Sequence, residues 1–202
     1  MQRSLLVASN NQGKIREIKD ALQPVFTTIL SLKEVNIFIS PEETGNTYLE
    51  NALIKAKAAA EFWNDWILAD DSGLEVEALQ GQPGLFSSRF AGENATDQEN
   101  NEKLLSLLKT TPPNKRAARF RCVAVLYHGA THQFLHAEGI CEGVITLAPK
   151  GEEGFGYDPL FLLPSLGRTM AELSFEEKMT LSHRANALQK LKELIEVHKI
   201  FN

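Results

Sequence analysis

Apolar runs and helix-period repeats alternate along the first part of the chain. Residues 5–8 form a compact apolar run of the kind found in buried strands. After a polar segment, Ile15, Ile18 and Leu22 recur at helical spacing, while the charged residues between them, Glu17 included, take the other face. Another strand is predicted near residues 35–39. The pattern therefore predicts a strand, a polar loop, a helix and a second strand in that order.

The rest of the chain repeats these signals. A serine or threonine followed three positions later by glutamate indicates a helix start, and this pairing begins at Thr47, Thr96 and Ser174. A last helix is expected to open at residues 182–184. Strands are predicted at residues 67–69, 74–78, 119–127, 134–141 and 160–163, with the third and fourth forming a hairpin. Residues 112–116 are predicted to be an exposed loop.

The composition is that of an ordinary soluble globular protein, with 43% apolar and 23% charged residues in a chain of 202. This length predicts one domain, or one domain with two lobes. The net charge of −5 argues against non-specific attraction to duplex nucleic acid, but it leaves room for a local basic pocket that binds a small anion. No apolar run is long enough to span a bilayer, so we expect no membrane partner.

Cysteine and histidine spacing gives no metal motif. Cys122 and Cys141 lack CxxC spacing, and no signal peptide is recognisable, which favours reduced thiols and a cytoplasmic protein. His128, His132 and His136 are four residues apart, a helical spacing, but they lie in the predicted hairpin. We therefore expect these histidines to be surface residues.

Two adjacent acids, Asp70 and Asp71, follow the apolar run at residues 67–69. Adjacent carboxylates at a strand end repel each other unless a cation lies beside them. A divalent metal is the usual remedy, because Mg²⁺ binds carboxylate oxygens and keeps water and phosphate as its other ligands. The alternative is a solvated Asp-Asp-Ser-Gly turn. Glu43, which precedes the helix that starts at Thr47, is a further acid with no structural explanation.

The polar segment at residues 9–14 connects the first strand to the first helix. Asn10 or Asn11 can cap that helix, whose positive end and backbone N–H groups form a natural seat for a phosphate. Lys14 adds a full positive charge. The alternative is an ordinary capped helix, because the segment is not a Walker sequence.

A second glycine-rich segment, at residues 151–159, carries two aromatic residues and an acid. This composition is typical of a wall for a flat ligand, whereas a phosphate loop would need a flanking strand and helix. Three cations, Lys178, His183 and Arg184, follow it. Cations at a helix start oppose the helix dipole, so this cluster predicts a bound anion nearby.

Six motifs occur in order from residue 5 to about residue 188. They are Ser9-Asn10-Asn11-Gln12-Gly13-Lys14; Glu43-Thr44-Gly45 with Glu50-Asn51-Ala52; Ala69-Asp70-Asp71-Ser72-Gly73-Leu74; Pro83-Gly84 with Ser88-Arg89; Phe155-Gly156-Tyr157-Asp158-Pro159; and Ala171-Glu172-Leu173 through Lys178 to Ser182-His183-Arg184. Together they resemble the inosine/xanthosine triphosphate pyrophosphatase family, which removes deaminated purine nucleotides. The first motif departs from the family's usual Thr-Gly-Asn.

The resemblance implies an α/β fold with a long, twisted mixed β-sheet flanked by helices. Residues 1–202 would form a single domain of two lobes with a central active-site cleft. The resemblance also implies a cytoplasmic homodimer that uses Mg²⁺ to hydrolyse ITP, dITP and XTP to the nucleoside monophosphate and pyrophosphate. Its partners would then be purine nucleoside triphosphates, with no nucleic acid and no membrane.

Site residues are carried over one by one from the resemblance. Asp71 would be the catalytic general base, and Glu43 and Asp71 would hold Mg²⁺. Asp70 would support the metal site without binding the ion directly. The substrate-binding residues would be Ser9, Asn10, Asn11, Gln12, Gly13, Lys14, Ser72, Phe155, Gly156, Tyr157, Asp158, Lys178, His183 and Arg184. Phe155 would stack on the base, while backbone groups of residues 156–158, with His183 and Arg184, would read its edge. The triphosphate would be gripped by the residues at 9–14, with help from Ser72 and Lys178. Donors aimed at a 6-oxo group would reject adenine, which presents a donor of its own.

Three alternatives stay open. A related pyrophosphatase of the Maf type, acting on dTTP or UTP, is disfavoured by the Ser182-His183-Arg184 motif. A regulator that senses a triphosphate without cleaving it would not need both Glu43 and Asp71. A nucleic-acid-binding protein is disfavoured by the acidic balance and the lack of a basic stripe.

Overall fold

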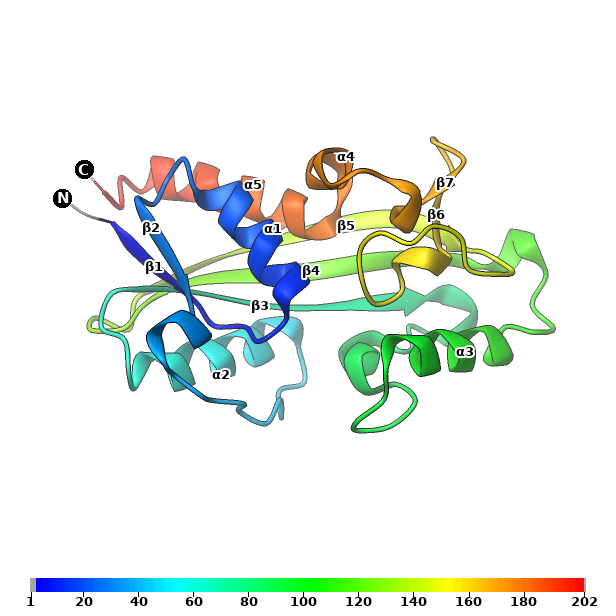
Figure 1. Cartoon of the computed structure of the whole chain (residues 1–202), viewed down its shortest axis with the longest axis horizontal. Coiled ribbons are helices and arrows are strands. Elements are labelled where there is room, and N and C mark those ends of the chain that lie inside the picture. Colours follow the sequence, from blue (N-terminus) through cyan, green and yellow to red (C-terminus); the bar gives the residue numbers. More distant parts are fainter. Residues whose placement is uncertain (1–2, 202) are drawn as a thin grey trace. The chain divides into compact units, whose positions relative to one another are not determined.

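Strands form a mixed seven-stranded sheet in the computed structural model of this protein, which describes residues 3–201 (Figure 1). Their order across the sheet is β2-β1-β3-β4-β5-β6-β7. The strands are β1 (Ser4–Val7), β2 (Thr28–Ser31), β3 (Trp66–Val76), β4 (Ala117–His128), β5 (Phe134–Ile145), β6 (Phe161–Leu163) and β7 (Arg168–Thr169). β1 pairs in parallel with β2 and β3, whereas β6 is antiparallel to β5 and β7. The prediction of an α/β protein with a mixed sheet is confirmed.

The α-helices of the described residues are α1 (Gln12–Leu22), α2 (Tyr48–Ala60), α3 (Asp97–Leu107), α4 (Phe175–Leu181) and α5 (His183–Val197). Thr96 and Ser174 form the predicted capping boxes, and Thr47 caps α2 through its side chain. Of the two candidate caps of α1, Asn11 is the one used. Within residues 3–201, none of the helices has the length and apolar character needed to cross a membrane.

The strand predicted near residues 35–39 is wrong. The strand lies earlier, at β2, and Lys33–Val35 form a short 3-10 helix that ends at Asn36 in the left-handed conformation. The cause is local, because the Glu34 carboxylate accepts hydrogen bonds from the backbone N–H and the hydroxyl of Ser31, both at 2.6 Å. Such side-chain bonds turn the backbone away from an extended path.

The sequence predicted that the loop at residues 112–116 is exposed, and this prediction is wrong for Arg116. Arg116 is only 3% exposed. Its guanidinium donates to the backbone oxygens of Thr111 at 3.0 Å, Leu108 at 2.7 Å and Thr146 at 2.9 Å. A buried guanidinium is tolerated here because carbonyl oxygens satisfy its donors.

The chain divides into two compact units. Unit 1 comprises the described residues up to Asp71, the segment Cys122–Gly139, and the residues from Arg184 onward. Unit 2 comprises the segments Ser72–Arg121 and Ile140–His183. β3, β4 and β5 each contribute residues to both units.

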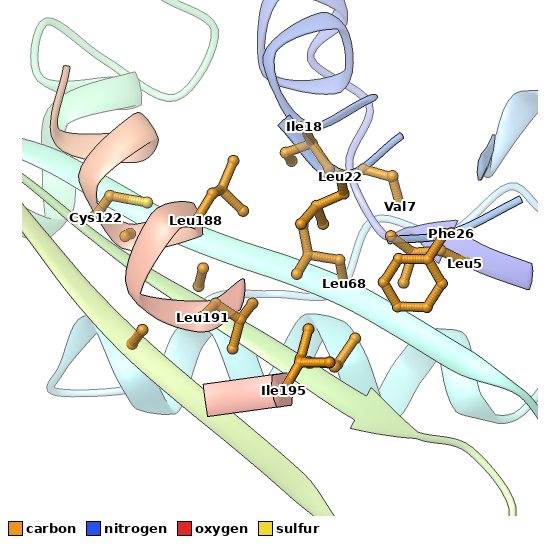
Figure 2. Close-up of a cluster of buried hydrophobic side chains, with 14 of the residues drawn as sticks. Leu5, Val7, Ile18, Leu22, Phe26, Leu68, Cys122, Leu188, Leu191 and Ile195 are labelled. Carbon is orange, nitrogen blue, oxygen red and sulfur yellow. The ribbon is translucent and has the colours of Figure 1, made fainter. Parts of the chain in front are cut away.

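The core of unit 1 lies between its strands and two helices (Figure 2). The predicted apolar face of α1 packs there against Leu188 and Leu191 of α5 and against strand residues that include Leu5 and Leu68. In unit 1, α2 lies on the opposite face of the strands from α1 and α5 (Figure 1). Its row of small residues, Ala52, Ala56 and Ala59, is fully buried. The strands of this unit are therefore covered on both faces.

The core of unit 2 is built separately. Leu104 of α3 and Leu108, which directly follows that helix, pack with Leu74 and Val76 of β3. The same cluster contains the side chain of Tyr157, from the second glycine-rich segment. That segment is therefore anchored in a hydrophobic core at one of its aromatic residues.

Candidate active site

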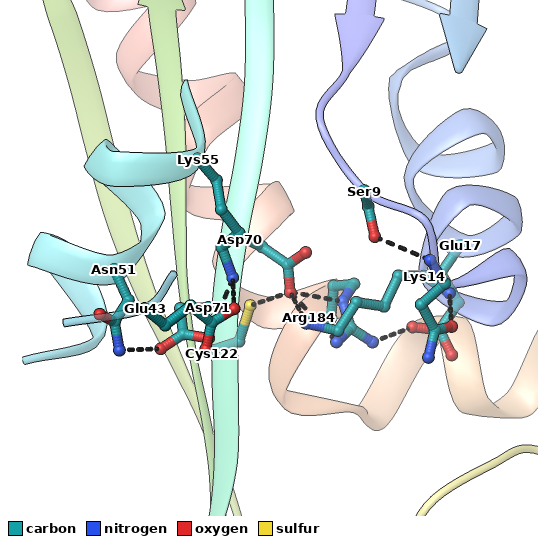
Figure 3. A network of polar contacts seen from close by, with 11 residues as sticks. Ser9, Lys14, Glu17, Glu43, Asn51, Lys55, Asp70, Asp71, Cys122 and Arg184 are labelled. Carbon is teal, nitrogen blue, oxygen red and sulfur yellow. Dashed lines mark hydrogen bonds and ion pairs between the residues drawn. The ribbon is translucent and has the colours of Figure 1, made fainter. Parts of the chain in front are cut away.

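The two adjacent acids lie inside a continuous strand. β3 runs through the whole stretch from Trp66 to Val76, so the two predicted strand segments are one. Asp70 is 2% exposed and Asp71 is 5% exposed, which excludes the solvated turn. Because successive side chains of a strand point to opposite faces, the two carboxylates have different neighbours (Figure 3).

Asp70 faces a cluster of cations. Its Oδ2 atom lies 3.0 Å from Lys14 Nζ and accepts from Arg184 Nε and Nη2, both at 3.2 Å. The Cys122 thiol, 3.7 Å away, is a further donor. Burial alone would raise the pKa of Asp70, but Lys14 and Arg184 outweigh it and hold this pKa well below its usual range. Asp70 is therefore a permanently ionised group.

Arg184 also pairs with Glu17, through Nη1 and Oε2. The prediction that Glu17 takes the exposed face of α1 is wrong, since Glu17 is 3% exposed and Arg184 1%. A buried charge requires an opposite charge, and here the two partners are 167 residues apart in the sequence. The sequence suggested that Arg184 needs an external anion, whereas the protein supplies two carboxylates of its own.

Asp71 faces α2 and a lysine that the sequence analysis missed. Lys55 Nζ lies 3.1 Å from Asp71 Oδ1 and 3.0 Å from Glu43 Oε1. The second carboxylate oxygen of Asp71 accepts from Asn51 Nδ2 at 3.2 Å. The spacing of Asn51 and Lys55, four residues apart on one helix face, is the signal that could have found this lysine.

The pKa values of Asp71 and Lys55 reflect their burial and the charges of their neighbours. Burial raises the pKa of Asp71, and the neighbouring charge of Glu43 adds to this effect, while Lys55 opposes it. Burial would lower the pKa of Lys55, but Asp71, Asp70 and Glu43 outweigh it, so the pKa of Lys55 is raised. Two acids thus share one ammonium group, and one negative charge remains.

Gly45 explains part of the motif around Glu43. Its backbone N–H donates to Asn51 Oδ1 at 2.8 Å, which orients the amide that holds Asp71. A Cβ atom on Gly45 would lie 2.6 Å from the Cβ of Glu50 and 2.7 Å from that same amide oxygen. Only glycine therefore permits this close approach.

Glu43 and Asp71 are the residues that fit a divalent cation. They already hold a cation between them, and Asp70 Oδ1 nearby in the chain is a buried oxygen without a hydrogen-bond partner among the described residues. Within residues 3–201, no three His, Cys, Asp or Glu side chains form a complete metal-binding group. This donor set suits a cation that takes one or two carboxylates and completes its shell with phosphate and water.

The predicted phosphate seat is the N-terminal end of α1. Asn11 Oδ1 accepts from the backbone N–H of Lys14 at 3.0 Å, and Ser9 Oγ accepts from that of Asn11 at 3.2 Å. Asn10 Nδ2 donates to the backbone oxygen of Ile39 at 3.1 Å. Two further predicted residues, Gln12 and Gly13, form the first turn of the helix. The structure thus brings these six residues into unit 1 with Glu43, Asp71 and Arg184.

The other predicted site residues lie in unit 2. Asp158 Oδ2 accepts from Lys178 Nζ at 2.6 Å and from the backbone N–H of Phe155 at 3.0 Å. Lys178 Nζ lies 4.5 Å from the centre of the Phe155 ring, within the range of a cation–π contact. Gly154 adopts φ +80°, and a Cβ there would lie 2.1 Å from Asp158 Oδ2. These contacts fix a half-buried phenylalanine beside a lysine.

Three further predicted residues lie in unit 2. His183 is buried and stacks on Phe120, with ring centres 4.7 Å apart. The Tyr157 hydroxyl donates to the backbone oxygen of Ser87 at 2.8 Å, and burial raises the pKa of Tyr157 well above its usual value. Ser72 is a partly buried residue of β3 that directly follows Asp71. The predicted residues therefore form two groups, one in each unit.

The hairpin histidines form no such group. Among the described residues, His132 Nδ1 lies 2.8 Å from the Tyr127 hydroxyl, and His128 packs against Trp66 edge to face. His132 and His136 are exposed, as predicted.

The sheet and the acid-and-cation group of unit 1 define an α/β protein equipped to handle phosphate groups. The chain belongs to the Ham1 family, whose model matches residues 5–194. It is 51% identical over 193 residues to a dITP/XTP pyrophosphatase of Desulforamulus reducens. The aligned residues make up 95% of this chain and 94% of that protein. It is 45% identical to a dITP/XTP pyrophosphatase of Bacillus subtilis, over 97% and 98% of the two chains.

Solved structures agree with this assignment. The Staphylococcus aureus Ham1 protein superimposes with a TM-score of 0.84 at 42% identity, over 97% of this chain and all of that one. A HAM1 protein from Coxiella burnetii gives a TM-score of 0.85 at 41% identity, over 96% of this chain and 98% of that one. The family suggested by the six motifs is therefore confirmed.

Proposed function

We propose that this chain hydrolyses deaminated purine nucleoside triphosphates, namely ITP, dITP and XTP, to the nucleoside monophosphate and pyrophosphate. Such an enzyme would remove these nucleotides from the cellular pool. Relatives at 45% to 51% identity are named for this activity on dITP and XTP. The observation that carries the proposal is the group formed by Asp71, Glu43 and Lys55, in which a buried acid of raised pKa lies beside a second acid and a shared cation.

The residues of unit 1 would perform the hydrolysis. Asp71 would accept a proton from the attacking water, which the raised pKa of a buried carboxylate favours. Lys14 and the N-terminal end of α1 would hold the triphosphate oxygens. Glu43 and Asp71 would hold Mg²⁺, which when bound supplies positive charge to phosphate oxygens as pyrophosphate leaves. Asn51 would keep the Asp71 carboxylate in a fixed orientation.

The residues of unit 2 would select the base. Phe155 offers a ring face for stacking, and Lys178 is a donor beside it. A 6-oxopurine can accept a hydrogen bond from such a donor, whereas the 6-amino group of adenine is itself a donor. A site built on this pairing can reject the wrong base by ~10⁴-fold.

We extend the proposal to the setting of the enzyme. Residues 1–202 would act as one domain with two lobes, and two copies would form a homodimer, as the family resemblance implies. Because nucleoside triphosphates are made and used in the cytoplasm, we propose that the enzyme acts there.

The test is pyrophosphate release from ITP, XTP, GTP, ATP and dTTP with Mg²⁺, for the wild type and for Asp71→Asn. We expect rapid release from ITP and XTP and slow release from ATP. Asp71→Asn keeps the size of the side chain but removes the base, so kcat should fall by about 10³-fold. Binding of inosine monophosphate should stay unchanged in this variant.

Two results would contradict the proposal. Preferential turnover of dTTP would assign the chain to the pyrimidine-directed Maf-type enzymes. Absence of turnover with every nucleotide, combined with tight binding of ITP, would instead favour a triphosphate sensor.

A further inference from the structure

Two side chains of α3 bind the backbone of one residue of the glycine-rich segment, at the two peptide groups that flank its Cα atom. Asp97 Oδ2 accepts from the backbone N–H of Gly156 at 2.6 Å. Asn101 Nδ2 donates to the backbone oxygen of the same residue at 2.8 Å. Asp97 and Asn101 are four residues apart and thus lie on one face of α3. More than fifty residues separate them from Gly156 in the sequence, so only the fold of unit 2 creates this clamp.

The clamp changes the role expected for Gly156. Its backbone N–H is already used by Asp97, so it is not the donor that reads a base edge in this structure, and its carbonyl oxygen already accepts one bond from Asn101. Gly156 follows Phe155 directly, and the backbone N–H of Phe155 is fixed by Asp158. The backbone that carries the Phe155 ring is therefore fixed by Asp158 at Phe155 and by the two residues of α3 at Gly156.

A purely structural role would leave one feature unexplained. Asn101 Oδ1 is buried and has no hydrogen-bond partner among the described residues. An unpaired buried acceptor is costly, and reversing the amide would place this oxygen against the backbone oxygen of Gly156. The amide is thus oriented by its donor, which binds the carbonyl oxygen of the residue that follows Phe155.

We propose that Asp97 and Asn101 are positioning residues for the purine base, which fix the Gly156 peptide so that Phe155 accepts a 6-oxopurine. This inference rests on the proposed function and adds a specificity element outside the six sequence motifs. The two residues act through Phe155 and do not touch the reacting phosphate. Loss of the clamp should therefore weaken base binding and base selection while leaving the chemical step intact.

Two nearly isosteric substitutions separate the clamp from helix stability. Asn101→Asp replaces the donor by an acceptor that faces the Gly156 oxygen, so the clamp opens. Asp97→Asn retains an acceptor for the Gly156 N–H, so the clamp persists in weaker form. If the two residues only stabilised α3, Asp97→Asn would have the larger effect. Asp97 is the first residue of that helix, and its negative charge interacts favourably with the helix dipole. Gln98→Ala is the matched control, since among residues 3–201 the Gln98 side chain bonds to Glu102, within α3.

For Asn101→Asp we expect KM for ITP to rise about tenfold with kcat within about twofold of wild type. The ratio of kcat/KM for ITP over ATP should fall about fivefold, because adenine lacks the 6-oxo group. The Kd of inosine monophosphate, measured by calorimetry, should weaken by the same factor as KM. Asp97→Asn should change these values by less than about threefold while lowering Tm more than Asn101→Asp does. Gln98→Ala should match the wild type.

Asn101→Ala removes the donor without adding charge, and it replaces Asn101→Asp if that variant fails to fold. The inference is overturned if these two variants retain the wild-type KM and ITP-over-ATP ratio, or if kcat falls while KM stays constant. A wild type that releases pyrophosphate from ITP beside such unaffected variants would refute the clamp alone. A wild type that neither hydrolyses ITP nor binds inosine monophosphate would refute the proposed function, and the clamp with it.

Discussion

The two groups of site residues use different physical means to hold their shape. In unit 1, charged side chains face one another, and Lys55, Arg184, Asp70 and Asp71 are held by ion pairs at 3.0 to 3.2 Å. In unit 2, side chains bind the backbone of a loop, as Asp97 and Asn101 do at Gly156. The first arrangement fixes charge, and the second fixes the orientation of an aromatic ring.

This difference matches the two tasks of the proposed reaction. Phosphoryl chemistry depends on fixed charges beside the phosphate, because charge on its oxygens must be stabilised. Base selection depends on a rigid surface that presents a ring and a few donors. A variant in unit 1 should therefore change kcat, and a variant in unit 2 should change KM and substrate preference.

After Asp71→Asn, Lys55→Met gives the largest expected effect. It leaves Glu43 and Asp71 without their shared cation, so Asp71 becomes harder to ionise and kcat for ITP should fall about 10²-fold. The Kd of inosine monophosphate should stay within about twofold. Lys57→Met is the control, because Lys57 is exposed on the same helix. If Lys55→Met mainly weakened the binding of inosine monophosphate, the assignment of catalysis to unit 1 and base binding to unit 2 would be wrong.

Phe155→Ala should have the next largest effect. Stacking of a base on an aromatic ring contributes about 1–3 kcal/mol, so KM for ITP should rise at least about fivefold. The kcat value should stay within about threefold. Phe86→Ala provides the comparison, because Phe86 belongs to the same unit and is 60% exposed. A large fall in kcat for Phe155→Ala would place the ring in the chemical step.

The two thiols give the smallest effect and compare the units without substrate. Burial raises the pKa of Cys122, in unit 1, to about 12 and that of Cys141, in unit 2, to about 11. Only the thiolate reacts with a disulfide reagent, so the native protein should resist labelling at pH 8. As the pH rises towards 10, Cys141 should react before Cys122, which mass spectrometry of labelled peptides can measure. Earlier reaction of Cys122 would show that unit 1 opens more readily than unit 2.

Much of the fold follows from local sequence signals. The capping residues of α2, α3 and α4 were identified from short motifs, and β1, β4 and β5 from apolar patterns, because these features depend on neighbours in the sequence. The strand predicted at residues 35–39 failed because Glu34 and Ser31 form a local turn that the apolar pattern does not report. The predicted exposure of Arg116 was wrong for a different reason, since the hydrogen-bond partners of its side chain include Thr146, on another part of the chain.

The candidate site was predicted in the same uneven way. Asp71 and Glu43 were found because acids with no structural reason are conspicuous in a sequence. Lys55 was missed because a lysine on a helix is usually solvated, and nothing local shows that Asp71 lies opposite. Glu17 was assigned to the solvent for the same reason, although Arg184 reaches it from the far end of the chain.

The sequence by itself determined the helix starts, the buried strands and the set of chemical groups, because each depends on a few adjacent residues. The tertiary structure alone decided which groups meet. It placed Lys55 between two acids, enclosed Arg184 between Glu17 and Asp70, and set α3 against Gly156. The physical reason is that a buried charge or amide is stable only beside a suitable partner, and packing brings such partners together from distant parts of the chain.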